Sequence, residues 1–154
     1  MNPTSSSLNP QLPGTYVIVD AQSDEEITAT FEVMKQLRTH LLKEEFIARI
    51  RRQQQVGYKL VYLTVNGIVV CVAGIRLTEN LAMGRHVYVD DLVTDNAHRS
   101  KGYGAILLQW TENFCRQEGC TEVHLDSGVQ RFEAHRFYFA QRMSIVFYHF
   151  SKKV

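Results

Sequence analysis

The sequence predicts an α/β protein in which helices flank a mixed, mainly antiparallel sheet. Two β-rich runs are joined by Asn66-Gly67, a dipeptide that favours the type I′ turn of a β-hairpin. Further along, strand-like and helix-like patterns alternate, which indicates strand–helix–strand crossovers. The length of 154 residues and the hydrophobic share of 45% suit one domain with a proper core. The expected order of elements is β-α-α-β-β-β-α-β-α-β.

The first third of the chain predicts a tail, one strand and two helices. Residues 1–13 are rich in Ser, Asn and Pro and form the expected flexible tail, while residues 14–154 form the single domain. The strand is expected at Thr15–Asp20. Ser23 followed three residues later by Glu26 is a capping box, which starts a helix with apolar residues at helical spacing up to Leu37. The second helix is expected from about Lys43 to Gln54.

The rest of the chain continues this mixed architecture. Three antiparallel strands are expected at Tyr58–Val65, Ile68–Ile75 and about His86–Thr94. A long amphipathic helix follows the Gly-rich turn after residue 98, and its end is marked by Gly119. The last elements are a strand at Thr121–Leu125, a helix at Phe132–Gln141 and a strand at Ser144–Phe150. Because its end is apolar and near a sheet edge, the last strand is a candidate homodimer contact through Val146–Phe150.

Charge and composition argue against several classes of function. The net charge of +1 gives no electrostatic case for nucleic acid or an anionic membrane surface as a partner. No apolar stretch reaches the ~18 residues that span a bilayer, and the N-terminus carries no signal-peptide block. The three cysteines match no zinc or redox spacing and are expected as buried, reduced thiols, which predicts a cytoplasmic location: Cys71, Cys115 and Cys120. No metal site is expected, because no cysteine or carboxylate lies at ligand spacing from His86, His124 or His135.

One short turn carries the strongest functional signal. It reads Arg99-Ser100-Lys101-Gly102-Tyr103-Gly104 and stands between the strand that ends at Thr94 and the long helix. The first N–H groups of a helix have no intrahelical acceptor and glycine permits close approach, so such a turn can bind a phosphate. The glycine spacing matches neither a Walker A loop nor a dinucleotide fingerprint. An ordinary helix-capping turn is the alternative interpretation of the same residues.

Two motifs in the right order resemble those of the GNAT superfamily of acetyl-CoA-dependent N-acetyltransferases. The first is Arg99-x-x-Gly102-x-Gly104 after Asp90-Asp91-Leu92-Val93-Thr94. The second is Ala134-His135-Arg136-Phe137-Tyr138, which is similar to that family's A-x-x-[LF]-Y segment. The resemblance covers roughly Thr15–Phe150. It implies a GNAT-like fold, acetyl-CoA as co-substrate and no metal.

The resemblance also implies which residues bind the donor. The pyrophosphate of coenzyme A would be held by the turn and the residue after it, namely Arg99, Ser100, Lys101, Gly102, Tyr103, Gly104 and Ala105. The pantetheine arm and the acetyl carbonyl would pair with the backbone of Leu92, Val93 and Thr94. The family often has Asn three residues before the Ala of the second motif, whereas this chain has Arg131, which could reach a phosphate instead.

The catalytic roles that the resemblance implies fall on three residues. Tyr138 would act as general acid on the leaving thiolate, although an aromatic on a buried helix face is the structural alternative. Asp90 or Asp91 would act as general base, and a water-mediated base remains open. Adjacent strand residues point to opposite faces, so we expect one carboxylate in the cleft and the other in a structural role.

The implied reaction is direct transfer of acetyl to a primary amine of a small molecule or peptide. A base must take the proton of the ammonium before attack, and a strand N–H can stabilise the oxyanion that forms on the thioester. The basic run Arg49, Arg51 and Arg52 is expected to be a solvated helix face, with an acidic acceptor as the weaker alternative. The alternative function is a non-catalytic acyl-CoA-binding regulatory or interaction module on the same fold.

Overall fold

A computed structural model describes residues 15–154, and the expected tail at residues 1–13 lies outside them. The chain forms two compact units, the first running to His124 and the second from Leu125 to Val154. None of the helices in residues 15–154 has the length and apolar character that crossing a membrane requires.

The first unit contains most of the regular structure. Its helices are α1 (Asp24–Ala29), α2 (Phe31–Leu37), α3 (Lys43–Gln54) and α4 (Tyr103–Gln117), with a 3₁₀ turn η1 (Asn96–His98) before α4. Its strands are β1 (Tyr16–Asp20), β2 (Tyr58–Val65), β3 (Ile68–Asn80), β4 (Gly84–Thr94) and all but the last residue of β5 (Val123–Leu125). The second unit carries α5 (Phe132–Ala140).

The sheet is a meander in which the strands stand in the order β1-β2-β3-β4-β5. Strands β1 to β4 pair antiparallel with their neighbours, as expected for the middle of the chain. Asn66 and Gly67 have φ of 50° and 79°, so both central residues of the β2–β3 turn lie in the left-handed region that a type I′ turn requires. Next to β4, the Val87 N–H donates to the carbonyl of Glu122 over 3.1 Å.

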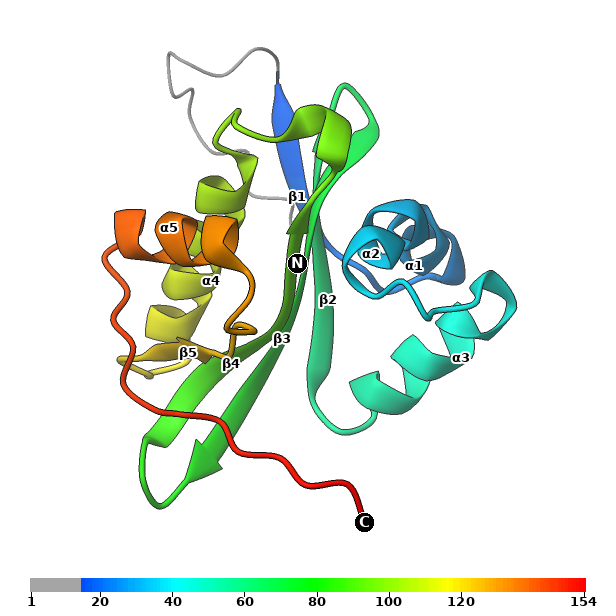
Figure 1. Ribbon diagram of the computed structural model, residues 1–154. Coiled ribbons are helices and arrows are strands. Elements are labelled where there is room, and N and C mark those ends of the chain that lie inside the picture. The colour runs from blue at the N-terminus through cyan, green and yellow to red at the C-terminus, as the bar shows by residue number, and fades with distance from the viewer. Residues whose placement is uncertain (1–14) are drawn as a thin grey trace. The chain divides into compact units, whose positions relative to one another are not determined.

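Helices cover both faces of this sheet, with α1, α2 and α3 on one side and α4 on the other (Figure 1). Alternate residues of β2 serve the first side, where Tyr58, Leu60 and Tyr62 pack in a core with residues of the three short helices. The helix residues of that core include Ile27, Phe31, Met34, Phe46 and Ile50. The α/β architecture predicted from the sequence is therefore confirmed in this unit.

The capping box forms as predicted, but the helix behind it is shorter than expected. The Glu26 N–H donates to Ser23 Oγ over 3.2 Å, and the Ser23 N–H donates to Glu26 Oε2 over 2.9 Å. The backbone N–H groups of Ser23 and Gln22, which both donate to Glu26 Oε2, lower the pKa of the Glu26 carboxyl. The helix is interrupted at Thr30, whose buried hydroxyl donates to the carbonyl of Ile27 over 2.7 Å. A side chain that competes in this way for a helix carbonyl bends or ends the helix, so two short helices replace one.

The end of α4 agrees with the sequence prediction. Gly119 adopts a φ of 73°, and its N–H donates to Arg116 while the Cys120 N–H donates to Cys115, over 3.1 and 2.9 Å. These two bonds form a Schellman motif, in which the residue after the glycine packs back on the helix. The two cysteines that the motif brings together are free and buried, and so is Cys71.

The predicted last strand is wrong. Residues 144–150 form no strand, and the side chains of Ile145, Phe147 and Tyr148 are 68%, 60% and 85% exposed. β-propensity measures how well side chains fit a paired, half-buried surface, and this segment has no strand partner within its unit. The candidate dimer edge at Val146–Phe150 therefore lacks the strand on which it depended. In contrast, β3 continues five residues beyond the predicted Ile75, because the residues from Arg76 to Asn80 also pair with β4.

Candidate active site

The turn before α4 has the shape of an anion site. Ser100 and Gly102 have φ of 60° and 83°, and the four residues 99–102 are exposed. Gly102 is the N-cap of α4 and has no side chain that could accept a hydrogen bond. Within the described part of the chain, the N–H groups of Tyr103, Gly104 and Ala105 therefore have no capping acceptor. The first bond of the helix runs from the Ile106 N–H to the Gly102 carbonyl, over 3.1 Å.

Two cations stand beside these amides. Arg99 and Lys101 have no ion-pair partner among residues 15–154, although nine pairs between other Lys or Arg side chains and carboxylates form in that part of the chain. The α4 macrodipole adds partial positive charge at the same point. The turn thus combines free N–H donors and two unpaired cations, which is the chemistry that a phosphate needs.

A side-chain network fixes the chain just before this turn. Asp95 accepts hydrogen bonds from Gln36 Nε2, over 2.7 Å, and from His98 Nδ1, over 2.5 Å. These bonds hold the pKa of the Asp95 carboxyl below its usual range, with the Gln36 bond as the largest cause. Asp95 also donates its N–H to the Val70 carbonyl over 2.9 Å. The exit from β4 is therefore held by contacts to α2 and β3.

A β-bulge interrupts β4 immediately before the expected donor-binding segment. Gly74 of β3 pairs with Asp91, and Ile75 pairs with Val89, so Asp90 is an extra residue on β4. After the bulge, pairing resumes at Leu92, Val93 and Thr94, opposite Ala73, Val72 and Cys71. A bulge leaves one residue out of the ladder and re-aims the side chains around it.

The bulge corrects the expectation that Asp90 and Asp91 point to opposite faces. Asp90 Oδ2 accepts from Arg76 Nε over 2.6 Å, while Asp91 Oδ2 accepts from the Tyr58 hydroxyl over 2.9 Å. Tyr58 and Arg76 are directly paired across β2 and β3, with the guanidinium 5.2 Å from the centre of the phenol ring, so they share a face. Both carboxylates therefore lie on that face.

The two carboxylates nevertheless differ in their surroundings. Asp91 has both oxygens engaged, because Arg38 Nε also donates to Asp91 Oδ1 over 2.7 Å, and its side chain is 12% exposed. Asp90 has one oxygen bound by Arg76 and is 24% exposed, and Oδ1 accepts no hydrogen bond from the described residues. Arg76 is held in turn by Gln53 Oε1 over 2.6 Å. Asp91 is thus a fully satisfied structural carboxylate, while Asp90 keeps an oxygen available.

Glycine at position 74 allows the contact between Tyr58 and Asp91. The Tyr58 side chain starts on β2 and passes over Gly74 of β3, and an added Cβ at Gly74 would overlap the phenol ring and its hydroxyl. Burial raises the pKa of Tyr58 well above its usual range, and the charge of Asp91 adds to the effect. The phenol therefore stays a hydrogen-bond donor to the carboxylate.

Tyr138 and Arg131 belong to the second unit. Tyr138 lies on α5, where it is half-buried with the Phe137 ring at 5.3 Å. Burial raises the pKa of this phenol above its usual value, and the charge of Arg131 partly opposes the shift. Arg131 is exposed and stands at the N-cap position of α5. In the loop before α5, the buried Ser127 hydroxyl has no hydrogen-bond partner in the described part of the chain.

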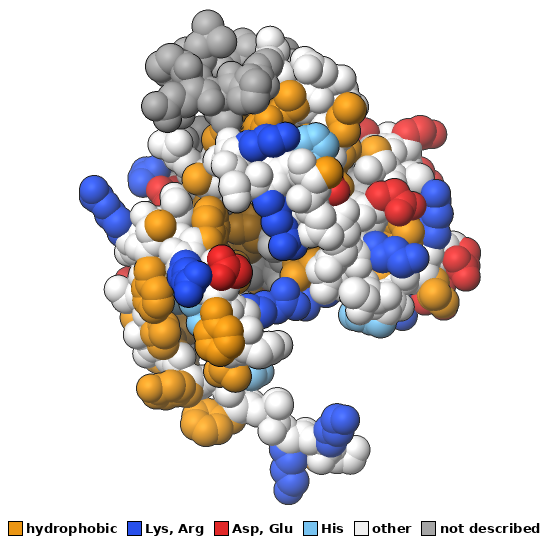
Figure 2. Space-filling model, turned by 45° about the horizontal axis from the view of Figure 1, so that its top comes forward, with side chains coloured by type: hydrophobic (Ala, Val, Ile, Leu, Met, Phe, Trp, Pro, Cys, Tyr) orange, Lys and Arg blue, Asp and Glu red, His pale blue; other side chains and the backbone are white. Residues whose placement is uncertain are grey.

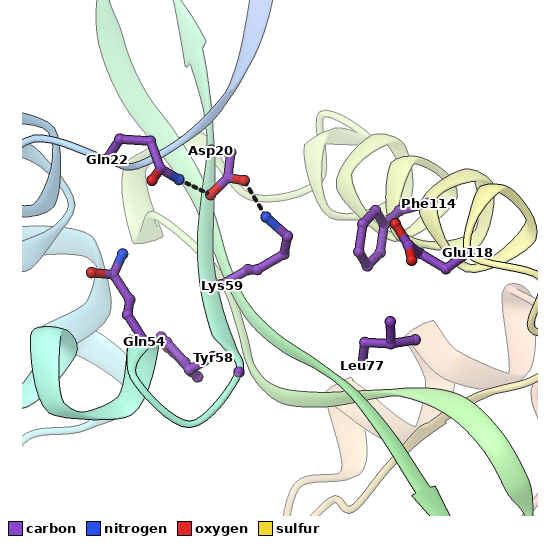
Figure 3. A pocket seen from close by; sticks show the side chains of 9 residues that line it. Asp20, Gln22, Gln54, Tyr58, Lys59, Leu77, Phe114 and Glu118 are labelled. Atoms are coloured by element: carbon purple, nitrogen blue, oxygen red, sulfur yellow. Dashed lines mark hydrogen bonds and ion pairs between the residues drawn. The ribbon is translucent and has the colours of Figure 1, made fainter. Parts of the chain in front are cut away.

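A separate pocket of about 490 Å³ opens at the start of β2. Figure 3 shows Lys59 directed at Asp20, which also accepts a hydrogen bond from Gln22, with Phe114 beside the lysine. Phe114 and Glu118 lie at the C-terminal end of α4, about 20 Å along the helix from the turn at its N-terminus. Because its charges are already paired and it lies far from the turn, this pocket is no part of the anion site.

The basic run on α3 is a solvated face, as expected. Arg51 pairs with Asp24 over 2.7 Å, and Arg49 pairs with Glu45 one turn away over 3.1 Å. Figure 2 shows Lys and Arg side chains interspersed with Asp and Glu over the α1–α3 part of the surface. This arrangement gives no support to an acidic acceptor site on α3.

Sequence reasoning missed the side chains that surround the two carboxylates. Arg38, Tyr58 and Arg76 come from three different elements and meet β4 only in the folded chain. One signal was available, because Gly74 stands inside an otherwise apolar strand pattern. Such a glycine often marks the close approach of another group, which here is the phenol.

Comparison with known proteins places this geometry in context. The model of the acetyltransferase (GNAT) family matches residues 20–143. The chain is 37% identical to the uncharacterized N-acetyltransferase YhdJ of Bacillus subtilis over 117 residues, which cover 75% of this chain and 82% of the relative.

Solved structures share the fold at low sequence identity. A glucosamine-6-phosphate N-acetyltransferase from Arabidopsis thaliana superposes with a TM-score of 0.73 at 22% identity, over 90% of this chain and 98% of the other. A ribosomal-protein-alanine N-acetyltransferase from Brucella melitensis superposes with a TM-score of 0.78 at 11% identity, over 91% and 99%. These two neighbours are named for different acceptors, so the shared fold does not specify one.

Proposed function

The chain belongs to the GNAT family of acetyltransferases, and we propose that it transfers an acetyl group from acetyl-CoA to a primary amine of a small molecule or peptide by direct attack in a ternary complex. Residues 14–154 would act as one acetyltransferase domain, in agreement with a family match that runs from residue 20 to residue 143 across both compact units. The buried free thiols favour a reducing, cytoplasmic location.

The turn before α4 carries the donor side of the proposal. Its free amides at Tyr103, Gly104 and Ala105, with the charges of Arg99 and Lys101, would hold the pyrophosphate of coenzyme A. The backbone of Leu92–Thr94 would pair with the pantetheine arm and stabilise the oxyanion that forms on the acetyl carbonyl. Arg131 is exposed and would add a further cation for a phosphate.

Asp90 is the carboxylate that we assign as general base. Both oxygens of Asp91 accept hydrogen bonds, from Arg38 and Tyr58, which protonation would weaken, whereas Asp90 Oδ1 accepts no bond from the described residues. Asp90, directly or through a water, would take the proton of the ammonium so that the amine nitrogen attacks the thioester carbon. Asp91 would then stabilise the bulge through its bonds to Arg38 and Tyr58.

Tyr138 would complete the reaction as general acid. When the carbon–sulfur bond breaks, the thiolate of coenzyme A needs a proton, which the phenol donates. Its raised pKa keeps the hydroxyl protonated at neutral pH, which suits a proton donor. No covalent enzyme intermediate is required.

Calorimetric titration with acetyl-CoA, followed by a panel of amines coupled to free-thiol detection, tests this function. Binding together with thiol release that depends on the amine supports it. Failure to bind acetyl-CoA at hundreds of micromolar would overturn the proposal. Binding without turnover on any amine would favour the non-catalytic acyl-CoA-binding module.

A further inference from the structure

The end of α2 contacts β4 and the residues just after it, at two places that are far from it in sequence. Gln36 lies in the last turn of α2, and Arg38 is the residue that caps the helix. Both side chains are half-buried and cross to the other element, 52 to 60 residues away along the chain. The two contacts lie at opposite ends of the segment Asp90–Asn96.

At the first end, Arg38 holds the bulge. Its Nη2 donates to the main-chain carbonyl of Asp90 over 2.7 Å, while its Nε donates to Asp91 Oδ1 over 2.7 Å. Asp90 is the extra residue of the bulge and has no ladder partner on β3. A main-chain carbonyl that leaves the ladder needs another donor, and Arg38 supplies it.

At the second end, Gln36 holds the exit of β4. Its Nε2 donates to Asp95 Oδ1 over 2.7 Å, and its Oε1 accepts the Asn96 N–H over 2.8 Å. A single amide side chain thus satisfies one side-chain oxygen and one backbone donor of adjacent residues. The phosphate-type turn begins three residues later, at Arg99.

We propose that Gln36 and Arg38 are positioning residues for acyl-CoA, which together hold Asp90–Asn96 in the geometry that the donor requires. This inference rests on the proposed function, because Leu92–Thr94 is the segment assigned there to the pantetheine arm and acetyl carbonyl. Gln36 acts on the side of the pyrophosphate turn. Arg38 acts on the bulge that carries Asp90, and so on both donor binding and proton transfer.

The test uses Gln36→Met and Arg38→Gln in the full chain, with Arg51→Gln as the matched control. Arg51 also pairs with an aspartate, Asp24, but among the described residues it forms no hydrogen bond or ion pair with β4. Gln36→Met should raise the Kd and the KM for acetyl-CoA about tenfold with little change in kcat, since it removes two hydrogen bonds remote from Asp90. Arg38→Gln should raise the KM and also lower kcat. Arg38→Lys should recover part of both effects, because one cationic donor remains.

Amide hydrogen exchange in the ligand-free protein supplies a second readout. Exchange across residues 90–96 should be faster in Gln36→Met and Arg38→Gln, and unchanged in Arg51→Gln. Unchanged exchange and unchanged acetyl-CoA affinity in both variants would overturn the inference while leaving the proposed function intact. If the unaltered protein bound no acetyl-CoA, the proposed function would fall, and the donor role of the two residues with it.

Discussion

Tyr58 on β2 donates its hydroxyl to Asp91 on β4 over 2.9 Å, across the intervening strand β3. The phenol passes over Gly74, where no Cβ obstructs it. A single side chain thus ties together three strands, and it does so at the bulge that positions Asp90. The contact connects the packed core beneath α1–α3 with the carboxylates proposed to serve the reaction.

Replacing Gly74 with Ala should therefore destabilise the protein through Tyr58. The new Cβ would overlap the phenol ring, and overpacking of this kind costs about 1–3 kcal/mol in the free energy of unfolding. Urea denaturation measures that free energy. In a Tyr58→Leu background the same Gly74→Ala change should cost much less, since the ring is gone. Equal costs in the two backgrounds would show that the glycine is needed for another reason.

The two aspartates should respond differently to replacement by Asn. Asp91→Asn should lower the free energy of unfolding by about 2 kcal/mol, because it weakens charge-assisted bonds to Arg38 and Tyr58. Asp90→Asn should leave stability closer to that of the parent and lower kcat by about 10²-fold or more, as for loss of a general base. Denaturation and steady-state rates on both proteins make the comparison. The reverse pattern would move the base to Asp91.

Removing the cations of the turn should weaken donor binding. Arg99→Gln and Lys101→Gln should each raise the Kd for acetyl-CoA several-fold, and added salt should reduce the difference from the parent. Arg52→Gln on α3 is the matched control, because Arg52 is likewise exposed and lacks an ion-pair partner among residues 15–154. Calorimetry at two salt concentrations provides the measurement. A similar loss in the Arg52 variant would indicate a general charge effect.

Tyr138→Phe should lower kcat by about 10²-fold and leave the Kd for acetyl-CoA nearly unchanged. The pKa of the phenol is raised above its ordinary value of 10.0, so the acid form that donates the proton persists from neutral pH to beyond that value. Ionisation of Tyr138 should therefore cause no fall in kcat below about pH 9. A pH–rate profile tests this expectation. A fall in that range that disappears in the Phe variant would contradict it.

The three thiols should be inert in the folded protein. Burial raises the pKa of the Cys71 thiol to about 11, and burial also raises the pKa of Cys115. Since the thiolate is the reactive form, an aromatic disulfide reagent at mildly alkaline pH should react slowly with the native chain and with three equivalents after unfolding. Absorbance of the released thiolate follows the reaction. Rapid labelling of the native protein would show that at least one thiol is accessible.

Local chemistry made much of the fold predictable. The Asn66-Gly67 turn, the capping box at Ser23, the bounds of α3 and the helix end at Gly119 all depend on residues within a few positions of one another. The residues at each of these points have a strong backbone preference of their own, so the local sequence pattern was enough to predict the structure there. The predicted strand at 144–150 depended instead on a partner, which β-propensity does not specify.

The same distinction between local and tertiary contacts applies to the candidate site. The turn at Arg99–Gly104 was visible because its glycines and its helix are adjacent in sequence. The roles of Asp90 and Asp91 could not be predicted from the sequence, because they depend on Arg38, Tyr58 and Arg76. These residues contact β4 only through the tertiary structure. The regular alternation of a strand also predicted opposite faces for the two carboxylates, and one extra residue in β4 was enough to make that wrong.

That extra residue divides β4 into two stretches that are out of phase. Val89 pairs with Ile75 and Val93 pairs with Val72, and the two partners, three apart on β3, lie on opposite faces. Val89 and Val93 therefore serve different sides of the sheet although both have odd numbers, and Val93 belongs to the core beneath α1–α3. Loss of the single codon for Asp90 would remove the bulge, and the residues from Asp91 to Thr94 would keep their present partners and their present sides of the sheet. At this point of the gene, a deletion of one codon is therefore compatible with the sheet, and its cost is the loss of the carboxylate proposed as general base.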